Sequence, residues 1–372
     1  MNTIPLKSQR LLSLDVFRGM TIVLMILVNG QAAIDPYPIL EHVDWDGCTL
    51  ADLVFPFFLF IVGLTSVISL KNQRERKSKS SLYSAIIERS IVLFLLGLFL
   101  NVFPHPVEFD SIRVYGILQR IAICYLISTF IYLNTSIRTQ FFIFLVLLLG
   151  YWILMTQVPV PGYGANQLTK DGSWVSYFDQ LLFSASHLYE KTYDPEGFLS
   201  TFTSIATTLS GVLAGSLLIN PFSQLKKFYL LGAAGLLFLL LGWLWNMSFP
   251  INKNLWTSSY VLWTSGLALL IFALCYLLID ELDIKKWSVF FKIFGMNALF
   301  AFVFHVILLK LQYAFKITTS DGSKMALISY IKDYFFGGFS NHNAALLYSI
   351  CFLSLNFLVV LILYKRKVFI RI

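Results

Sequence analysis

Long apolar runs alternate with short polar links along almost the whole chain. Each run is close to the roughly 20 residues that a helix needs to cross the hydrocarbon core of a bilayer. The predicted architecture is an all-α polytopic transmembrane bundle that forms a single domain over residues 1–372. We predict ten membrane-spanning helices, at residues 13–34, 50–70, 84–103, 114–134, 139–157, 198–219, 227–248, 256–279, 289–312 and 344–364.

Basic residues fall on alternate links of this pattern. With ten spans they all lie on one side of the membrane, which the positive-inside rule identifies as the cytoplasmic side. Both termini are therefore expected in the cytoplasm. The basic residues are Lys7, Arg10, Lys71, Arg74, Arg76, Lys77, Lys79, Arg138, Lys226, Lys227, Lys285, Lys286, Lys365, Arg366, Lys367 and Arg371.

The links on the opposite side are richer in aromatic, acidic and turn residues. The longest of them, residues 158–197, exceeds what a simple connection needs. It also contains too many aromatic side chains for a disordered segment. We expect this segment to fold over the outer mouth of the bundle.

The composition agrees with a membrane protein. The chain is 57% hydrophobic and 13% charged, whereas about a quarter of the residues of a soluble domain are charged. The net charge of +8 follows the position of the links, so it indicates topology and not nucleic-acid binding. The four cysteines form no CxxC or Cys/His pattern, and we expect no metal site.

A cluster of titratable residues lies in the link between the first two spans. Its central residue is His42, which has Glu41, Asp44 and Asp46 beside it, and Asn29 ends the preceding span. A histidine near carboxylates suits a general base. A solvated loop histidine without a role would give the same pattern, so the residues alone leave both interpretations open.

Three arginines lie in or beside the spans. Arg18 is three residues after Asp15, so the two share a helix face and can pair. Arg18 and Arg89 are near the predicted cytoplasmic ends of their spans, where they suit either the phosphates of a nucleotide or lipid headgroups. Arg120 lies inside the fourth span and requires a partner or a water-filled cavity.

Asn297 and His305 are eight residues apart in the ninth predicted span. That spacing is about two helical turns, which places them on one face. Each suits a hydrogen bond between helices, and together they also suit a row of polar groups along a cofactor tunnel.

The outer links combine carboxylates and amides with aromatic rings, which suits a sugar because rings stack on pyranose faces and polar groups bond hydroxyls. Turn formation and helix capping are the alternative roles. No Walker loop, dinucleotide glycine fingerprint or GxSxG motif appears. The candidate sugar contacts are Trp45, Asp179, His187, Asp194, Glu196, Lys253, Asn254 and Trp256.

Several ordered segments resemble the heparan-alpha-glucosaminide N-acetyltransferase family, including its shorter bacterial members. They are SLDVFRG at 13–19, MILVN at 25–29, H-x-x-W-x-G-x-T-x-x-DLVFP from His42 to Pro56, GILQR at 116–120, PVPG at 159–162, YFDQLLF at 177–183, HLY at 187–189, YDPEG at 193–197, NKNLW at 252–256, GMN at 295–297 and His305. Their order over most of the chain makes the resemblance specific.

The resemblance implies transfer of an acetyl group from cytoplasmic acetyl-CoA to the amino group of a glucosamine-type sugar across the membrane. It implies that His42 is the active-site histidine and Asn29 its asparagine. It also implies a homodimer and, for a bacterial member, the inner membrane with the His42 loop outside. Asp46 stands where the family pattern has asparagine, and we expect no counterpart of the animal lumenal N-terminal region, so the resemblance defines the acceptor less closely than the reaction.

These observations predict His42, Asn29 and Asp46 as catalytic residues, and Arg18, Arg89, Arg120, Asn297 and His305 as contacts of acetyl-CoA. Direct attack by the amine and a covalent acetyl-histidine route both fit. A secondary transporter of an amino sugar or small acid is the alternative function, because ten spans with polar residues near the midplane also suit a transporter. A membrane scaffold without chemistry would leave the polar residues unexplained.

Overall fold

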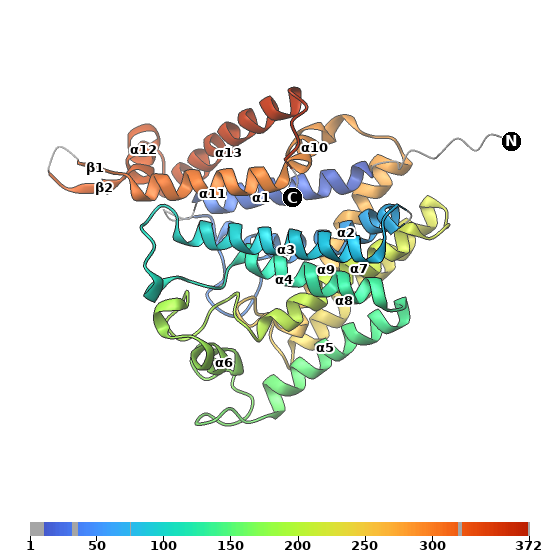
Figure 1. The fold of residues 1–372 in the computed structure, drawn as a ribbon. Helices are drawn as coiled ribbons and strands as arrows, with labels where there is room; N and C mark the ends of the chain where they lie inside the picture. The colour runs from blue at the N-terminus through green and yellow to red at the C-terminus, as the bar shows by residue number, and fades with distance from the viewer. Residues whose placement is uncertain (1–10, 32–35, 75, 319–321, 371–372) are drawn as a thin grey trace.

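The computed structural model describes residues 11–31, 36–74, 76–318 and 322–370, and these form a helical bundle (Figure 1). The basic residues Lys7, Arg10 and Arg371 lie outside the described residues. The long helices are α1 (Leu12–Gln31), α2 (Leu50–Arg74), α3 (Lys79–Val102), α4 (Ile117–Asn134), α5 (Ile137–Gln157), α7 (Ser200–Ile219), α8 (Gln224–Asn246), α9 (Ser258–Tyr276, continued by a π-helical turn, Leu277–Glu281), α11 (Ala298–Ala314) and α13 (Asn341–Lys365). The shorter elements are α6 (Trp174–Leu182), α10 (Val289–Met296), α12 (Leu327–Phe336), β1 (Lys316–Thr318) and β2 (Lys324–Ala326).

The predicted all-α transmembrane bundle is confirmed. Within the described residues, nine helices are long and apolar enough to cross a membrane, and the number reaches ten when a bent pair of helices is counted as one span. Apolar side chains are exposed along α3, α5 and α8, whereas most of α2 and α7 is buried within the bundle. The outer helices thus present apolar surface as lipid requires.

The prediction of one continuous ninth span at 289–312 is wrong. The chain bends by 71° between α10 and α11. Asn297 lies at the break, where its side-chain amide donates to the carbonyl of Val368 (3.0 Å) and its carbonyl accepts from the N–H of Ile370 (3.0 Å). Asn297 and His305 therefore do not share one helix face. The amide of Asn297 holds the segment after α13 against this break.

Glycines allow the central helices to pack backbone against backbone. A Cβ added at Gly63 of α2 would lie 1.9 Å from the carbonyl oxygen of Thr208, and one at Gly211 of α7 would lie 2.0 Å from that of Phe60. Small residues at such crossings are a common feature of membrane helix pairs, because association depends on close packing. The α2–α7 pair forms the centre from which the functional loops extend.

Replacing Gly63 by alanine is expected to destabilise the protein by about 1–3 kcal/mol, because the methyl group would force α2 and α7 apart. The measurement is the thermal unfolding midpoint in detergent. Gly232→Ala on α8 is the matched control, since no neighbouring atom lies within 4 Å of its added Cβ. Equal midpoints for the two variants would show that the close approach does not limit stability.

The described residues of the long links gather toward one end of the bundle. Figure 1 shows α6 toward the same end as the β1–β2 hairpin and α12. The hairpin pairs Lys316 with Ala326 and Thr318 with Lys324. The 158–197 segment contains α6 and a 3₁₀ turn, Ala185–His187. Of the 158–197 segment, Glu196 lines the cavity of the candidate site.

Candidate functional site

The link between α1 and α2 is organised by Asp52 in the first turn of α2. One carboxylate oxygen of Asp52 accepts hydrogen bonds from the N–H of Thr49 (3.1 Å), the hydroxyl of Thr49 (3.1 Å) and the N–H of Val43 (3.3 Å). A carboxylate is favoured at this position because the N-terminus of a helix carries a partial positive charge. The fold of the loop therefore fixes a buried carboxylate directly behind His42.

His42, Asp52 and Lys253 meet at this point. Nδ1 of His42 lies 2.8 Å from Oδ1 of Asp52. Nζ of Lys253 lies 3.2 Å from the same oxygen and 3.1 Å from Nδ1 of His42. The side chain of His42 is 50% exposed, whereas that of Asp52 is fully buried. With the Nδ1 proton directed to Asp52, Nε2 becomes the basic nitrogen of the ring.

A cavity of about 70 Å³ joins His42 to residues from six other parts of the chain. Its polar wall consists of Asn29, His42, Glu196 and Lys253. Its remaining wall is apolar and comes mainly from α1 and α2, with Ile117 and Phe302. An apolar pocket with a few convergent polar groups is the usual form of a small-molecule site.

Asn29 is oriented by His305. The amide Nδ2 of Asn29 lies 3.0 Å from Nε2 of His305, and Nδ1 of His305 lies 3.2 Å from the carbonyl oxygen of Ala301. The carbonyl accepts from Nδ1–H, so Nε2 accepts from the amide of Asn29. His305 is fully buried. His305 therefore orients Asn29, which lines the cavity, but does not itself line the cavity.

Asp46 bonds to Asn252, although its position in the sequence places it beside His42. Its carboxylate accepts from the amide of Asn252 (3.0 Å), and the two residues form an isolated β-bridge. The neighbouring N–H of Gly47 donates to the carbonyl of Ile251 (2.7 Å). These bonds fasten the His42 loop to the 249–257 link and place Lys253, the next residue, beside His42.

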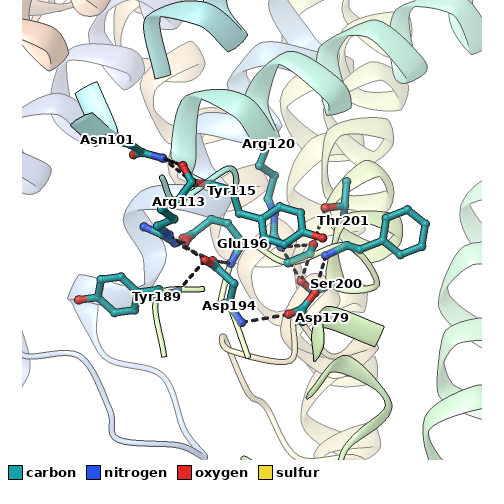
Figure 2. Close-up of polar contacts among 12 residues, drawn as sticks. Asn101, Arg113, Tyr115, Arg120, Asp179, Tyr189, Asp194, Glu196, Ser200 and Thr201 are labelled. Carbon is teal, nitrogen blue, oxygen red and sulfur yellow. Dashed lines mark hydrogen bonds and ion pairs between the residues drawn. The ribbon is translucent and has the colours of Figure 1, made fainter. Parts of the chain in front are cut away.

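Arg113 joins two of the predicted sugar contacts. Its guanidinium donates to both carboxylate oxygens of Asp194, at 2.7 and 2.6 Å, and to Glu196 (Figure 2). Burial by itself would lower the pKa of Arg113, but the hydrogen bonds and charges of Asp194 and Glu196 raise it above its ordinary value. Glu196 continues into the wall of the His42 cavity, whereas Asp194 is fully buried behind it.

Asp179 and His187 bond to backbone groups. The carboxylate of Asp179 accepts from the N–H groups of Asp194 (3.0 Å) and Phe198 (3.1 Å). Burial raises the pKa of Asp179 to about 6, against the effect of these two bonds. A ring N–H of His187 donates to the carbonyl of Ile112 (2.7 Å). Both residues therefore hold the 158–197 segment in shape.

Arg120 and Trp256 form a buried stack near the start of α4. The guanidinium of Arg120 lies 5.1 Å from the ring centroid of Trp256 and donates to the carbonyl of Gly197 (3.0 Å) and to the hydroxyl of Ser200. The indole N–H of Trp256 donates to Thr207 (3.0 Å). Both side chains are almost completely buried. Trp256 thus offers no open face to a sugar, and Arg120 supports the backbone next to Glu196.

Trp45 and Asn254 lie on the loops around the cavity. The indole N–H of Trp45 donates to the carbonyl of Leu168 (2.8 Å), and its ring meets the edge of Tyr193 at 5.5 Å. Asn254 is half-buried next to Lys253. Trp45 therefore links the His42 loop to the 158–197 segment.

The two remaining arginines have separate surroundings. Arg18 bonds to Asp15 (3.1 Å), which confirms that predicted pair, and to the carbonyl of Gly295 (3.2 Å). Arg89 lies 4.8 Å above the ring of Tyr125 and lines a second cavity, of about 390 Å³, between α2, α3 and α4. Arg18 thus contacts α10, whereas Arg89 contacts α4.

Sequence patterns predict no role in the reaction for two residues of the site, Asp52 and Arg113. They indicate Lys253 only as one of the candidate sugar contacts of the outer links. The spacing of Thr49 and Asp52 before an apolar run is a capping-box signal that identifies Asp52. No local pattern identifies Arg113, because its partners lie 81 and 83 residues away.

Comparison with known proteins gives a consistent result. A family model described as "Heparan-alpha-glucosaminide N-acetyltransferase, catalytic" matches residues 10–244. The heparan-alpha-glucosaminide N-acetyltransferase of Mus musculus is 30% identical over 420 residues, which cover 98% of this chain and 61% of the mouse protein. The Homo sapiens protein of the same name is 30% identical over 419 residues, covering 98% of this chain and 60% of the human protein. The chain thus spans about 60% of the length of these relatives.

Proposed function

The chain belongs to the heparan-alpha-glucosaminide N-acetyltransferase family, and we propose that it moves an acetyl group from cytoplasmic acetyl-CoA to the amino group of a glucosamine-type sugar or glycan end on the extracytoplasmic side. Family membership supports a transmembrane acetyltransferase. The observation that carries the finer proposal is the cavity that joins His42, Asn29, Lys253 and Glu196. These four side chains supply a base, an amide donor, a cation and an anion around one small space.

In this proposal His42 acts as the general base. The nitrogen of the acceptor amine attacks the carbonyl carbon of the thioester, the C–S bond breaks, and CoA leaves as a thiolate. Nε2 of His42 takes the proton from the amine and passes it to the leaving sulfur. Asp52 holds the ring through Nδ1 and stabilises the imidazolium that forms, as the carboxylate of a catalytic triad does.

Asn29 and Lys253 supply positive electrostatic potential near the reacting carbonyl. His305 takes one N–H of the Asn29 amide, and the other N–H is assigned to the oxyanion of the tetrahedral intermediate. The ammonium of Lys253 balances the charge of buried Asp52. Glu196 is assigned to the acceptor, because a carboxylate on the cavity wall attracts an amino group or accepts from a hydroxyl.

The donor is proposed to enter from the cytoplasmic side, where the basic links lie. Arg18 and Arg89 are the candidate contacts of the CoA phosphates, and the apolar wall formed by α1 and α2 suits the pantetheine arm. We also propose a homodimer in a bacterial inner membrane, and this part of the proposal rests on the family resemblance alone. The 158–197 segment, tied to the His42 loop through Trp45, is proposed to cover the outer mouth.

The test is CoA release by the purified protein in detergent, with acetyl-CoA supplied in the presence and absence of glucosamine. We expect CoA release that depends on the amino sugar. A transporter would instead move labelled glucosamine into proteoliposomes without acetyl-CoA and would release no CoA. Uptake of that kind, with no CoA release for any amino sugar or glycan end, would replace the acetyltransferase with the transporter alternative.

A further inference from the structure

We propose that α12 is an interfacial anchor, whose row of aromatic side chains inserts into the phospholipid leaflet at the end of the bundle where α11 ends and α13 begins. The aromatic row consists of Tyr330, Tyr334 and Phe335. It lines neither of the two cavities described above. The inference concerns a separate surface of the protein and does not depend on acetyl transfer.

The aromatic row is exposed, although its rings pack on one another. Tyr334 is 70% exposed and Phe335 is 66% exposed. The ring of Tyr334 stacks on that of Tyr330, with centroids 5.9 Å apart, and meets the edge of Phe335 at 5.0 Å. Phe339, which follows α12, is also exposed. Contiguous exposed apolar side chains mark a surface that contacts a membrane or another protein.

Other side chains of α12 fasten it to the bundle. Ile328 is fully buried in the main hydrophobic core, and Ile331 and Phe336 pack against the same core. The N–H of Leu327, the first residue of α12, donates to the carbonyl of Phe315, directly after α11 (2.8 Å). The aromatic row is therefore carried by a helix that is held in place, and it extends away from the part of that helix that packs on the protein.

The place of α12 in the chain brings it to a membrane face. It lies between α11, which belongs to the bent pair that can be counted as one span, and α13, which is long and apolar enough to cross a membrane. Phe336 ends α12 and Asn341 begins α13, so the two ends are no more than about 18 Å apart. Figure 1 shows α12 beside the β1–β2 hairpin at the end of α11.

The surroundings of the aromatic row favour phospholipid over a second copy of the chain. Lys316 and Lys324 are exposed on the hairpin, whose strands both contact α12, and their ammonium groups suit the phosphates of lipid headgroups. Exposed apolar side chains continue along α13, at Ile350, Leu355 and Leu358. Aromatic rings and lysines at the end of an apolar surface are the usual composition of a membrane interface.

The test measures the surroundings of a nitroxide spin label in proteoliposomes. Phe335→Cys carries the label, in a protein whose two incompletely buried cysteines, Cys48 and Cys351, are replaced by serine. Oxygen concentrates in the bilayer and a nickel chelate stays in water, so the collision rates of the label with these two reagents distinguish lipid from solvent. The references are Leu236→Cys, at an exposed apolar position of α8, and Lys191→Cys, at an exposed position of the 158–197 segment.

We expect the label at Phe335→Cys to behave like the one at Leu236→Cys, with more frequent collisions with oxygen than with the nickel chelate. Lys191→Cys is expected to show the reverse. Nickel collisions at Phe335→Cys as frequent as those at Lys191→Cys would overturn the proposal, because the row would then face water. Few collisions with either reagent, together with spin–spin broadening between labels, would also overturn it and would identify a second copy of the chain as the partner.

Discussion

Replacing His42 by alanine is expected to lower the rate of acetyl transfer by about 10²–10⁴-fold, the usual contribution of a positioned general base. The fold is expected to survive the change, because His42 lies at a half-exposed position and its removal opens no buried cavity. The measurement is acetylated sugar formed per unit time, together with the thermal unfolding midpoint of the same preparation.

Two further variants show whether the effect depends on the His42–Asp52 pair. Asp52→Asn keeps the shape of the carboxylate but removes its charge, so it is expected to cost about as much as the loss of His42, because the ring loses its preferred tautomer. Glu41→Gln changes an exposed carboxylate next to His42 and is expected to retain full activity. Near-normal turnover of His42→Ala, or an equal loss in Glu41→Gln, would contradict the assignment of His42 as the base.

Replacing Arg113 by methionine is expected to destabilise the protein by about 3 kcal/mol or more, since removing one partner of a buried ion pair leaves an uncompensated charge. Asp194 is fully buried and would lose both of its bonds to the guanidinium. The expected result is a clear fall in the thermal unfolding midpoint in detergent. Arg113→Lys is expected to rescue only part of it, because an ammonium cannot form the bidentate contact.

The exposed pair of Lys285 and Asp283 provides the control. Both side chains are exposed, and surface ion pairs contribute about 0–1 kcal/mol. Lys285→Met should therefore leave the midpoint almost unchanged. Adding Asp194→Asn to Arg113→Met should recover part of the stability, because the buried charge is then removed. A midpoint of Arg113→Met equal to that of Lys285→Met would show that the cluster in Figure 2 does not stabilise the outer loops.

The spans were predictable because the bilayer requires the same local property in every one of them. About 20 apolar residues in succession specify a crossing helix whatever its neighbours are. The bend at Asn297 has a different origin. Its partners are backbone groups of Val368 and Ile370, more than 70 residues later in the chain. Only the folded bundle brings that contact about, so hydropathy alone continues the helix through it.

The candidate site was predictable in part for the same reason. Asn29 ends one apolar run and His42 follows it, so the sequence already places both residues at one membrane face. Both line the same cavity. The partners of His42 are harder to predict from the sequence, because Lys253 lies in a link more than 200 residues away. Residue type also misled the interpretation of Trp256. An aromatic residue in an outer link suits a sugar, but packing against Arg120 buries this one.

The most direct test of acetyl transfer across the membrane uses sealed proteoliposomes that contain acetyl-CoA with a ¹³C-labelled acetyl group, with glucosamine supplied only outside. We expect N-acetylated sugar that carries the label in the external solution, and no such product from liposomes with His42→Ala. Loss of acetyl-CoA without any labelled sugar, or labelled sugar at an equal rate from the His42→Ala variant, would contradict acetyl transfer across the membrane by this site.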